Sequence, residues 1–142
     1  LEEVNVRRYK IASRSINDLE LINELIKTKK PLIASLGFWQ NNELPTIDSE
    51  NTVDYLFCIS KYPAPLEEFK LNSVNFKNKY SGFSDHSLGI SAACSSFVLG
   101  SNILEKHFTI DKNMYGPDHS CSMDPNELKQ IKIFLKDWNS CK

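Results

Sequence analysis

At two places in the second half of the chain a histidine follows another polar residue by two positions. Ser84 precedes His86 by two positions, and Glu105 precedes His107 by two. If each segment is a strand, both members of a pair lie on one face of it. Two imidazoles on neighbouring strands can bind a divalent metal. The alternative is that each imidazole is buried and hydrogen-bonded to a backbone carbonyl.

The expected ion follows from the ligands that the sequence offers. Thiolates at zinc spacing do not occur in the sequence. Water and substrate oxygens would complete the coordination of two histidines, which suits Mn²⁺ or Mg²⁺ better than structural zinc.

A lysine and several serines near the ends of apolar runs could bind a phosphate or a carboxylate. Lys10 supplies a point charge, and hydroxyl donors come from Ser13, Ser35 and Ser84. The sequence has no glycine-rich phosphate loop. Two alternatives stay open: such serines commonly cap the next helix, and Lys10 can be a surface lysine whose stem covers apolar side chains.

Other polar residues follow further apolar runs. Asp118 comes directly after Gly116-Pro117, which is also typical of a simple turn. Lys106 alternates with Glu105, so we expect it on the opposite strand face, outside the site or paired with a helix. Cys58 ends an apolar run with no histidine near it in the sequence, and we interpret it as a core residue.

The elements that must position these residues alternate between strand and helix patterns, which favours βα units and a parallel sheet. The last predicted helix has the clearest start, with Asp124 as N-cap, Pro125 at the first position and Glu127 three residues after the cap. We expect strands at about 6–12, 31–36, 53–60, 80–84 and 101–108, and helices at about 18–29, 66–79, 90–99 and from 125 onward.

Five units in 142 residues average about 28 residues each, close to the roughly 31 of a (β/α)₈ barrel. Five eighths of a barrel and a five-stranded doubly wound sheet fit equally well. Both place the chemistry at the carboxyl ends of the strands.

Composition excludes several classes of protein. The chain has 41% hydrophobic and 25% charged residues, and 17 basic against 18 acidic residues give a net charge of −1. This balance argues against a nucleic-acid or anionic-membrane binder. No stretch approaches the roughly 18 apolar residues of a membrane span, and no apolar signal core occurs at the start. We therefore expect a soluble, cytoplasmic α/β protein.

Two further expectations concern the cysteines and the chain start. The four cysteines form no CxxC pair and should be reduced thiols. The chain begins at Leu1 rather than Met, and a strand-like run follows almost at once. We expect a fragment of a longer protein.

The motifs taken in order resemble those of the N-acetylneuraminate (sialic acid) synthase family, which includes legionaminate, pseudaminate and spore-coat polysaccharide synthases. They are KIAS at 10–13, SLG at 35–37, CISKYPAP at 58–65, GFSDHSLGI at 82–90, EKHFTID at 105–111 and GPDHSCSMDPNEL at 116–128. The resemblance implies that residues 1–142 form part of a (β/α)₈ TIM barrel, with five βα units corresponding to strands four to eight. It also implies that the first three βα units and the C-terminal antifreeze-like domain are absent.

The family condenses phosphoenolpyruvate with an N-acyl-mannosamine-type aldehyde and releases phosphate, so the resemblance implies a metal-dependent transferase of carbohydrate biosynthesis. It implies a homo-oligomer at full length, and no activity for the fragment alone. By motif, His86 and His107 would bind Mn²⁺ or Mg²⁺, and Glu105 would orient water or stabilise positive charge. The phosphoenolpyruvate contacts would be Lys10, Ser13, Ser35 and Ser84, and Tyr62 and Asp118 would contact the acceptor sugar, Asp118 with a catalytic role.

Three features depart from the family pattern. Ser15 stands where a carboxylate is common, Ser35-Leu36-Gly37-Phe38 replaces the usual Ser-Thr-Gly-Met, and the connection that follows is short. Two other functions stay open: a noncatalytic relative that binds a sugar or a partner chain, and another phosphoenolpyruvate-dependent deoxy-keto-acid synthase.

Overall fold

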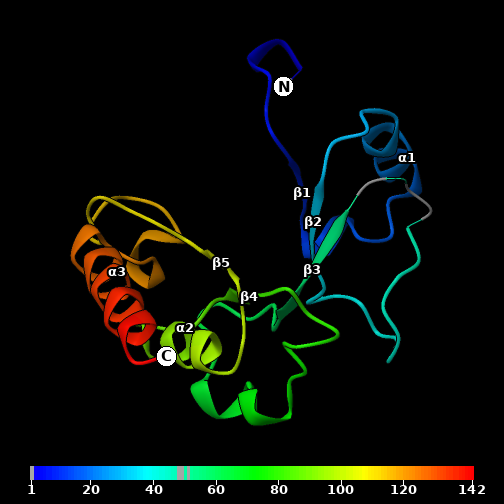
Figure 1. Cartoon of the computed structure of the whole chain (residues 1–142). Helices are drawn as coiled ribbons and strands as arrows, with labels where there is room; N and C mark the ends of the chain where they lie inside the picture. Colours follow the sequence, from blue (N-terminus) through cyan, green and yellow to red (C-terminus); the bar gives the residue numbers. More distant parts are fainter. Residues whose placement is uncertain (1, 48–49, 51) are drawn as a thin grey trace.

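The computed structural model describes residues 2–47, 50 and 52–142. Its centre is one parallel sheet in the order β1-β2-β3-β4-β5, so each strand pairs with the next along the chain (Figure 1). A doubly wound sheet would reverse its strand order at a switch point, whereas sequential order is that of a barrel wall. The strands are Tyr9–Ile11 (β1), Leu32–Ser35 (β2), Val53–Cys58 (β3), Gly82–Asp85 (β4) and Ile103–Lys106 (β5).

In the described part of the chain, three α-helices accompany this sheet. They are Leu19–Lys27 (α1), Ser91–Val98 (α2) and Pro125–Ser140 (α3). Helix α3 packs mainly against α2, and the ends of the helices follow the local sequence. Helix α3 begins with the predicted capping box: the Asp124 carboxylate accepts from the Glu127 amide, and the Glu127 carboxylate accepts from the Asp124 amide. Past the end of α2, Gly100 has φ +109°, a conformation that favours glycine.

The predicted helix at 66–79 is wrong. This segment contains two short 3₁₀ turns, Leu66–Glu68 (η3) and Leu71–Ser73 (η4), separated by Lys70 in the left-handed region at φ +44°. Phe69 and Phe76 instead pack edge-on against Phe83 of β4, with ring centroids 5.1 and 6.5 Å apart. Packing of aromatic rings onto the sheet therefore outweighs the helical pattern.

The core divides into clusters on the outer side of the curved sheet. Around β1 and β2 the buried apolar residues are Tyr9, Ile11, Ile16, Ile22, Leu32, Ala34 and Leu36. A second cluster joins the phenylalanines to α2, and a third joins α2 to α3. Among the described strands, β1 and β5 each have a neighbour on one side only.

Two predictions about the whole chain can be compared with the structure. All four cysteines are free thiols, as predicted. No helix in the described part of the chain is long and apolar enough to cross a membrane.

Candidate active site

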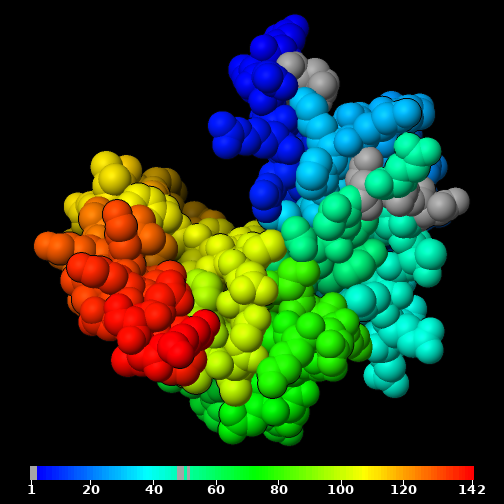
Figure 2. Space-filling view, viewed as in Figure 1, coloured from blue at the N-terminus to red at the C-terminus, as the bar shows by residue number. Residues whose placement is uncertain are grey.

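A cavity of about 640 Å³ opens at the carboxyl ends of the strands. Figure 2 shows the surface hollowed between the blue N-terminal segment and the yellow-to-orange segments that follow β5. Every predicted site residue except Ser35 lines this cavity. The lining residues are Lys10, Ala12, Ser13, Arg14, Phe38, Ser60, Tyr62, Ser84, His86, Glu105, Lys106, His107 and Asp118.

Side chains from two other strands contact the Glu105 carboxylate. Lys10 Nζ of β1 lies 2.6 Å from Glu105 Oε1, and the Ser35 hydroxyl of β2 donates to Oε2. Burial raises the pKa of Glu105, but the hydrogen bonds from Lys10 and Ser35 and the charge of Lys10 together hold that pKa below its ordinary value. The carboxylate is therefore ionised at neutral pH.

The predicted serines divide into two roles. Ser13 and Ser84 are buried and line the cavity, beside Lys10. Ser35 is also buried but contacts Glu105 instead of the cavity. The structure thus brings Lys10, Ser13 and Ser84 to one surface and places Ser35 behind it.

Gly37 is required by close packing behind the cavity. A Cβ atom there would lie 2.1 Å from Ser60 Oγ and 2.7 Å from Cys58 Sγ, so any other residue would displace these side chains. The Gly37 amide donates to Ser13 Oγ at 3.0 Å, which fixes the orientation of that hydroxyl.

The structure brings the two predicted histidines together, with ring centroids 5.7 Å apart. His86 Nδ1 lies 3.0 Å from the Ile59 carbonyl oxygen. Nδ1 therefore carries the proton that is donated to this carbonyl, and Nε2 keeps its lone pair. The Tyr62 hydroxyl lies 2.9 Å from Nε2 and donates to it.

This pair satisfies one chemical requirement of a metal site. Metal-ligating histidines commonly donate their other ring N–H to a carbonyl or a carboxylate, as His86 does to Ile59. In the described ranges, no three His, Cys, Asp or Glu residues gather into a group that could hold an ion. Two imidazoles are therefore what this part of the chain offers, and water or substrate oxygens would complete the coordination.

Cys58 is buried, as predicted, but it belongs to the polar cluster behind the cavity. Its sulfur lies 3.5 Å from Ser13 Oγ and 3.8 Å from His86 Nδ1. The interpretation as a core residue is confirmed. The contact with His86 could not be found from sequence neighbours, because that histidine comes from the adjacent strand. Burial raises the pKa of the Cys58 thiol, but hydrogen bonds from His86 and neighbouring serines outweigh it and lower that pKa. The contact with Cys58 in turn raises the pKa of His86, against the lowering effect of burial.

The two predicted acceptor residues enter the cavity from different loops. The Tyr62 ring lies beside both imidazoles, with centroids 4.2 Å from His86 and 5.4 Å from His107. Asp118 also has the structural role of a turn residue, because its carbonyl oxygen accepts from the Ser122 hydroxyl at 2.7 Å. The residue lines the cavity as well.

Five lining residues were not predicted: Ala12, Arg14, Phe38, Ser60 and Lys106. Lys106 was expected outside the site or paired with a helix, but it pairs with Asp85 of β4. Arg14 lies in the 3₁₀ turn Ser13–Ser15 (η2), directly after a predicted site residue. Its place next to Ser13 was the feature of the sequence that could have identified Arg14 as a lining residue. Ser60 likewise lies within the CISKYPAP motif.

The chain is similar to two curated synthases over almost its whole length. N,N'-diacetyllegionaminic acid synthase of Campylobacter jejuni is 34% identical over 143 positions, covering 92% of this chain and 43% of that protein. Pseudaminic acid synthase of Helicobacter pylori is 37% identical over 147 positions, covering 96% and 43%. The chain spans less than half the length of these two relatives.

A solved structure shares the fold. The crystal structure of the N-acetylneuraminic acid (sialic acid) synthetase from Leptospira borgpetersenii, in complex with citrate, aligns with a TM-score of 0.87 at 28% identity. The alignment covers 96% of this chain and 51% of that one. The family model of the NeuB family matches residues 1–140, and the chain belongs to the NeuB family.

Proposed function

We propose that this chain is part of a nonulosonic acid synthase, which condenses phosphoenolpyruvate with an N-acyl-hexosamine-type aldehyde and releases phosphate. Family membership supports the reaction class. One observation carries the proposal: a lysine that can bind an anion, an ionised carboxylate and two imidazoles all line one cavity. They belong to Lys10, Glu105, His86 and His107. These are the groups that a condensation between an anionic enol ester and an aldehyde requires.

The phosphoenolpyruvate would lie on the β1 side of the cavity. Lys10 offers a positive charge, and Ser84 offers a hydroxyl donor to phosphate or carboxylate oxygens. Ser13 would offer a second one once its hydroxyl releases the Cys58 sulfur, to which it donates. The ion pair with Glu105 holds Lys10 in place before the substrate arrives. Ser35 acts indirectly in this scheme, by donating to Glu105.

His86 and His107 would hold a divalent ion, Mn²⁺ or Mg²⁺, and their distance and the tautomer of His86 fit this role. When bound, such an ion would act as a Lewis acid on an aldehyde oxygen. Tyr62 and Asp118 would bind hydroxyl groups of the acceptor from the two sides of the cavity. Tyr62 must first release His86 Nε2, to which it donates a hydrogen bond.

The bond changes define the role of Glu105. C3 of phosphoenolpyruvate attacks the aldehyde carbon and forms a C–C bond, positive charge develops at C2, and water adds there. The ionised Glu105 would stabilise that charge and accept a hydrogen bond from the water. The former aldehyde oxygen takes up a proton and becomes a hydroxyl, and the added water loses one proton on bonding to C2. Phosphate then leaves by cleavage of the C2–O bond, and the C2 hydroxyl loses its remaining proton to give the ketone.

One observation favours a noncatalytic relative. Ser15 occupies the position where a carboxylate is common in the family, so a possible acid or base is lost. The cavity keeps Glu105 and Asp118, which supply two carboxylates without it. We therefore favour catalysis over a purely binding role.

The test uses the complete gene product, meaning this chain with whatever sequence flanks it. It is incubated with Mn²⁺, an N-acyl-mannosamine and phosphoenolpyruvate that carries ¹⁸O in the bridging position. We expect a nonulosonic acid by mass spectrometry and the label in the released phosphate. Unlabelled phosphate would contradict C–O cleavage, and no product with a panel of N-acyl-hexosamines would favour the binding role.

A further inference from the structure

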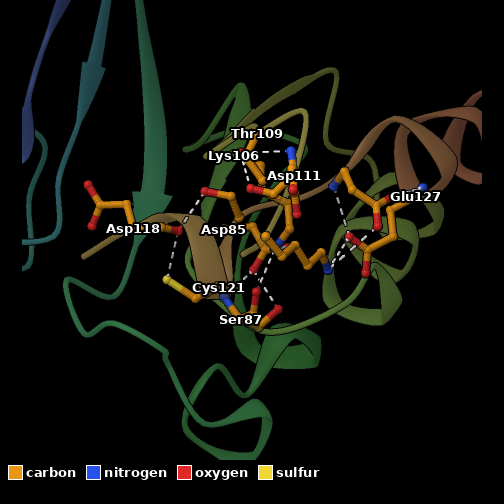
Figure 3. Close-up of polar contacts among 11 residues, drawn as sticks. Asp85, Ser87, Lys106, Thr109, Asp111, Asp118, Cys121 and Glu127 are labelled. Atoms are coloured by element: carbon orange, nitrogen blue, oxygen red, sulfur yellow. Dashed lines mark hydrogen bonds and ion pairs between the residues drawn. The ribbon is translucent and has the colours of Figure 1, made fainter. Parts of the chain in front are cut away.

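A buried ion pair joins β4 and β5 at the residues that directly precede the two histidines. Asp85 and Lys106 are Cα partners in the last rung of the β4–β5 ladder, and His86 and His107 are the next residue of each strand. Lys106 Nζ lies 2.9 Å from Asp85 Oδ2, and the side chains are 2% and 0% exposed. Figure 3 shows the lysine side chain pointing at Asp85 and Ser87.

Lys106 holds the chain on both sides of His86. Its ammonium group donates to the Asp85 carboxylate and, at 2.6 Å, to the Ser87 carbonyl oxygen. The other oxygen of Asp85 accepts from the Ser87 amide at 2.8 Å and from the Ser87 hydroxyl at 2.7 Å. The residues before and after His86 are therefore tied to the residue before His107.

Stability alone is a poor explanation for this arrangement. Removing two charges from water costs about as much free energy as their attraction returns, so buried pairs add little net stability. The β4–β5 ladder ends at the rung formed by Asp85 and Lys106. Beyond that rung the backbone pairing no longer fixes the distance between the strands, and the ion pair can do so.

We infer that Asp85, Ser87 and Lys106 are positioning residues that set the distance and orientation of the His86 and His107 imidazoles. The inference rests on the proposed function, in which these imidazoles hold a divalent ion. Hydrogen-bonding partners behind metal ligands typically contribute about 10- to 100-fold in metal affinity. Here the contact is made through the backbone that carries the ligands.

The test is the double variant Asp85→Asn/Lys106→Met in the complete gene product. The introduced asparagine keeps an oxygen for the Ser87 amide and hydroxyl, and no unpaired charge is left in the interior. Lys106→Met alone would leave a buried carboxylate without its partner and strongly destabilise the protein, which is why both residues are changed. The matched control is Glu24→Gln/Lys27→Met, which removes an exposed ion pair on α1.

Three quantities are measured. We expect the affinity for Mn²⁺, followed by the electron paramagnetic resonance signal of the free ion, to fall tenfold or more. Amide hydrogen exchange at residues 86–89 should accelerate about tenfold, because the segment has lost its anchor. The KM for phosphoenolpyruvate should change less than twofold, and the control variant should match the wild type in all three.

The outcomes separate this inference from the proposed function. Unchanged exchange and unchanged Mn²⁺ affinity in the double variant would overturn the inference, whatever the activity. Faster exchange in β2 and β3 as well would also overturn it, because the pair would then support the whole fold. If exchange accelerates only at 86–89 while the wild type forms no product, the positioning role stands and the proposed function fails.

Discussion

Lys10 Nζ lies 2.6 Å from Glu105 Oε1, although β1 and β5 are the outermost strands of the five-stranded sheet. In a flat sheet four intervals of about 4.8 Å would separate these strands by about 19 Å. A lysine and a glutamate side chain together cannot span that distance. The sheet must therefore curve into a half-barrel, and this curvature joins the proposed anion-binding group to the proposed catalytic carboxylate.

The first prediction concerns this lysine. Lys10→Met in the complete gene product should raise the KM for phosphoenolpyruvate tenfold or more, because a charged contact to the substrate is lost. Lys27→Met, an exposed lysine on α1, serves as the control. Steady-state kinetics measure both, and an unchanged KM and kcat for Lys10→Met would remove this residue from the site.

The second prediction concerns pH and Glu105. Its pKa lies below the ordinary 4.5, because the contacts with Lys10 and Ser35 outweigh burial. A group with a depressed folded-state pKa adds stability above its unfolded pKa and loses it as pH falls through the folded value. The free energy of unfolding of the wild type should therefore exceed that of Glu105→Gln above about pH 5, and the difference should shrink below pH 4.5.

Denaturant unfolding of both proteins at several pH values measures this difference. Glu67→Gln, on the exposed turn η3, is the control and should run parallel to the wild type. A difference that stays constant down to pH 3 would show that the ionisation of Glu105 contributes nothing to stability.

The third prediction concerns the imidazole pair. His86→Ala or His107→Ala should each lower Mn²⁺-dependent turnover by orders of magnitude, since each removes one of two protein ligands. The loss of thermal stability should be far smaller, because both residues lie at the cavity surface rather than in an apolar cluster.

His119→Ala tests whether any histidine would have the same effect. His119 Nδ1 is hydrogen-bonded to the Thr109 hydroxyl at 2.7 Å, and this residue does not line the cavity. The Mn²⁺ concentration that gives half-maximal turnover should stay at the wild-type value. Equal effects of all three variants would contradict a site made by His86 and His107.

The fourth prediction separates the acceptor from phosphoenolpyruvate. Removing the Asp118 carboxylate leaves acceptor hydroxyls unpaired, at a cost on the order of 1 to 3 kcal/mol. Asp118→Ala should lower kcat/KM for the aldehyde about tenfold or more, with phosphoenolpyruvate affinity nearly unchanged. Equal weakening of both substrates would instead indicate collapse of the loop that Asp118 holds through Ser122.

Local features of the fold could be predicted from the sequence. The capping box of Asp124 and Glu127 was one, because its hydrogen bonds join residues three positions apart. The five strands were another, since buried parallel strands appear as short apolar runs. The segment at 66–79 could not be predicted, because its conformation depends on the contact between Phe76 and Phe83, which belongs to another element.

In the candidate site, too, some features could be predicted from the sequence and others depended on contacts between distant residues. The sequence by itself determined which residues follow the carboxyl ends of the strands, and Lys10, His86, His107 and Asp118 all line the cavity. Only the tertiary structure decided which side chains contact one another. Ser35 contacts Glu105, Cys58 contacts His86, and Lys106 contacts Asp85. The physical reason is that strand periodicity fixes the face on which a side chain lies, whereas the curvature and register of the sheet fix which side chain lies opposite.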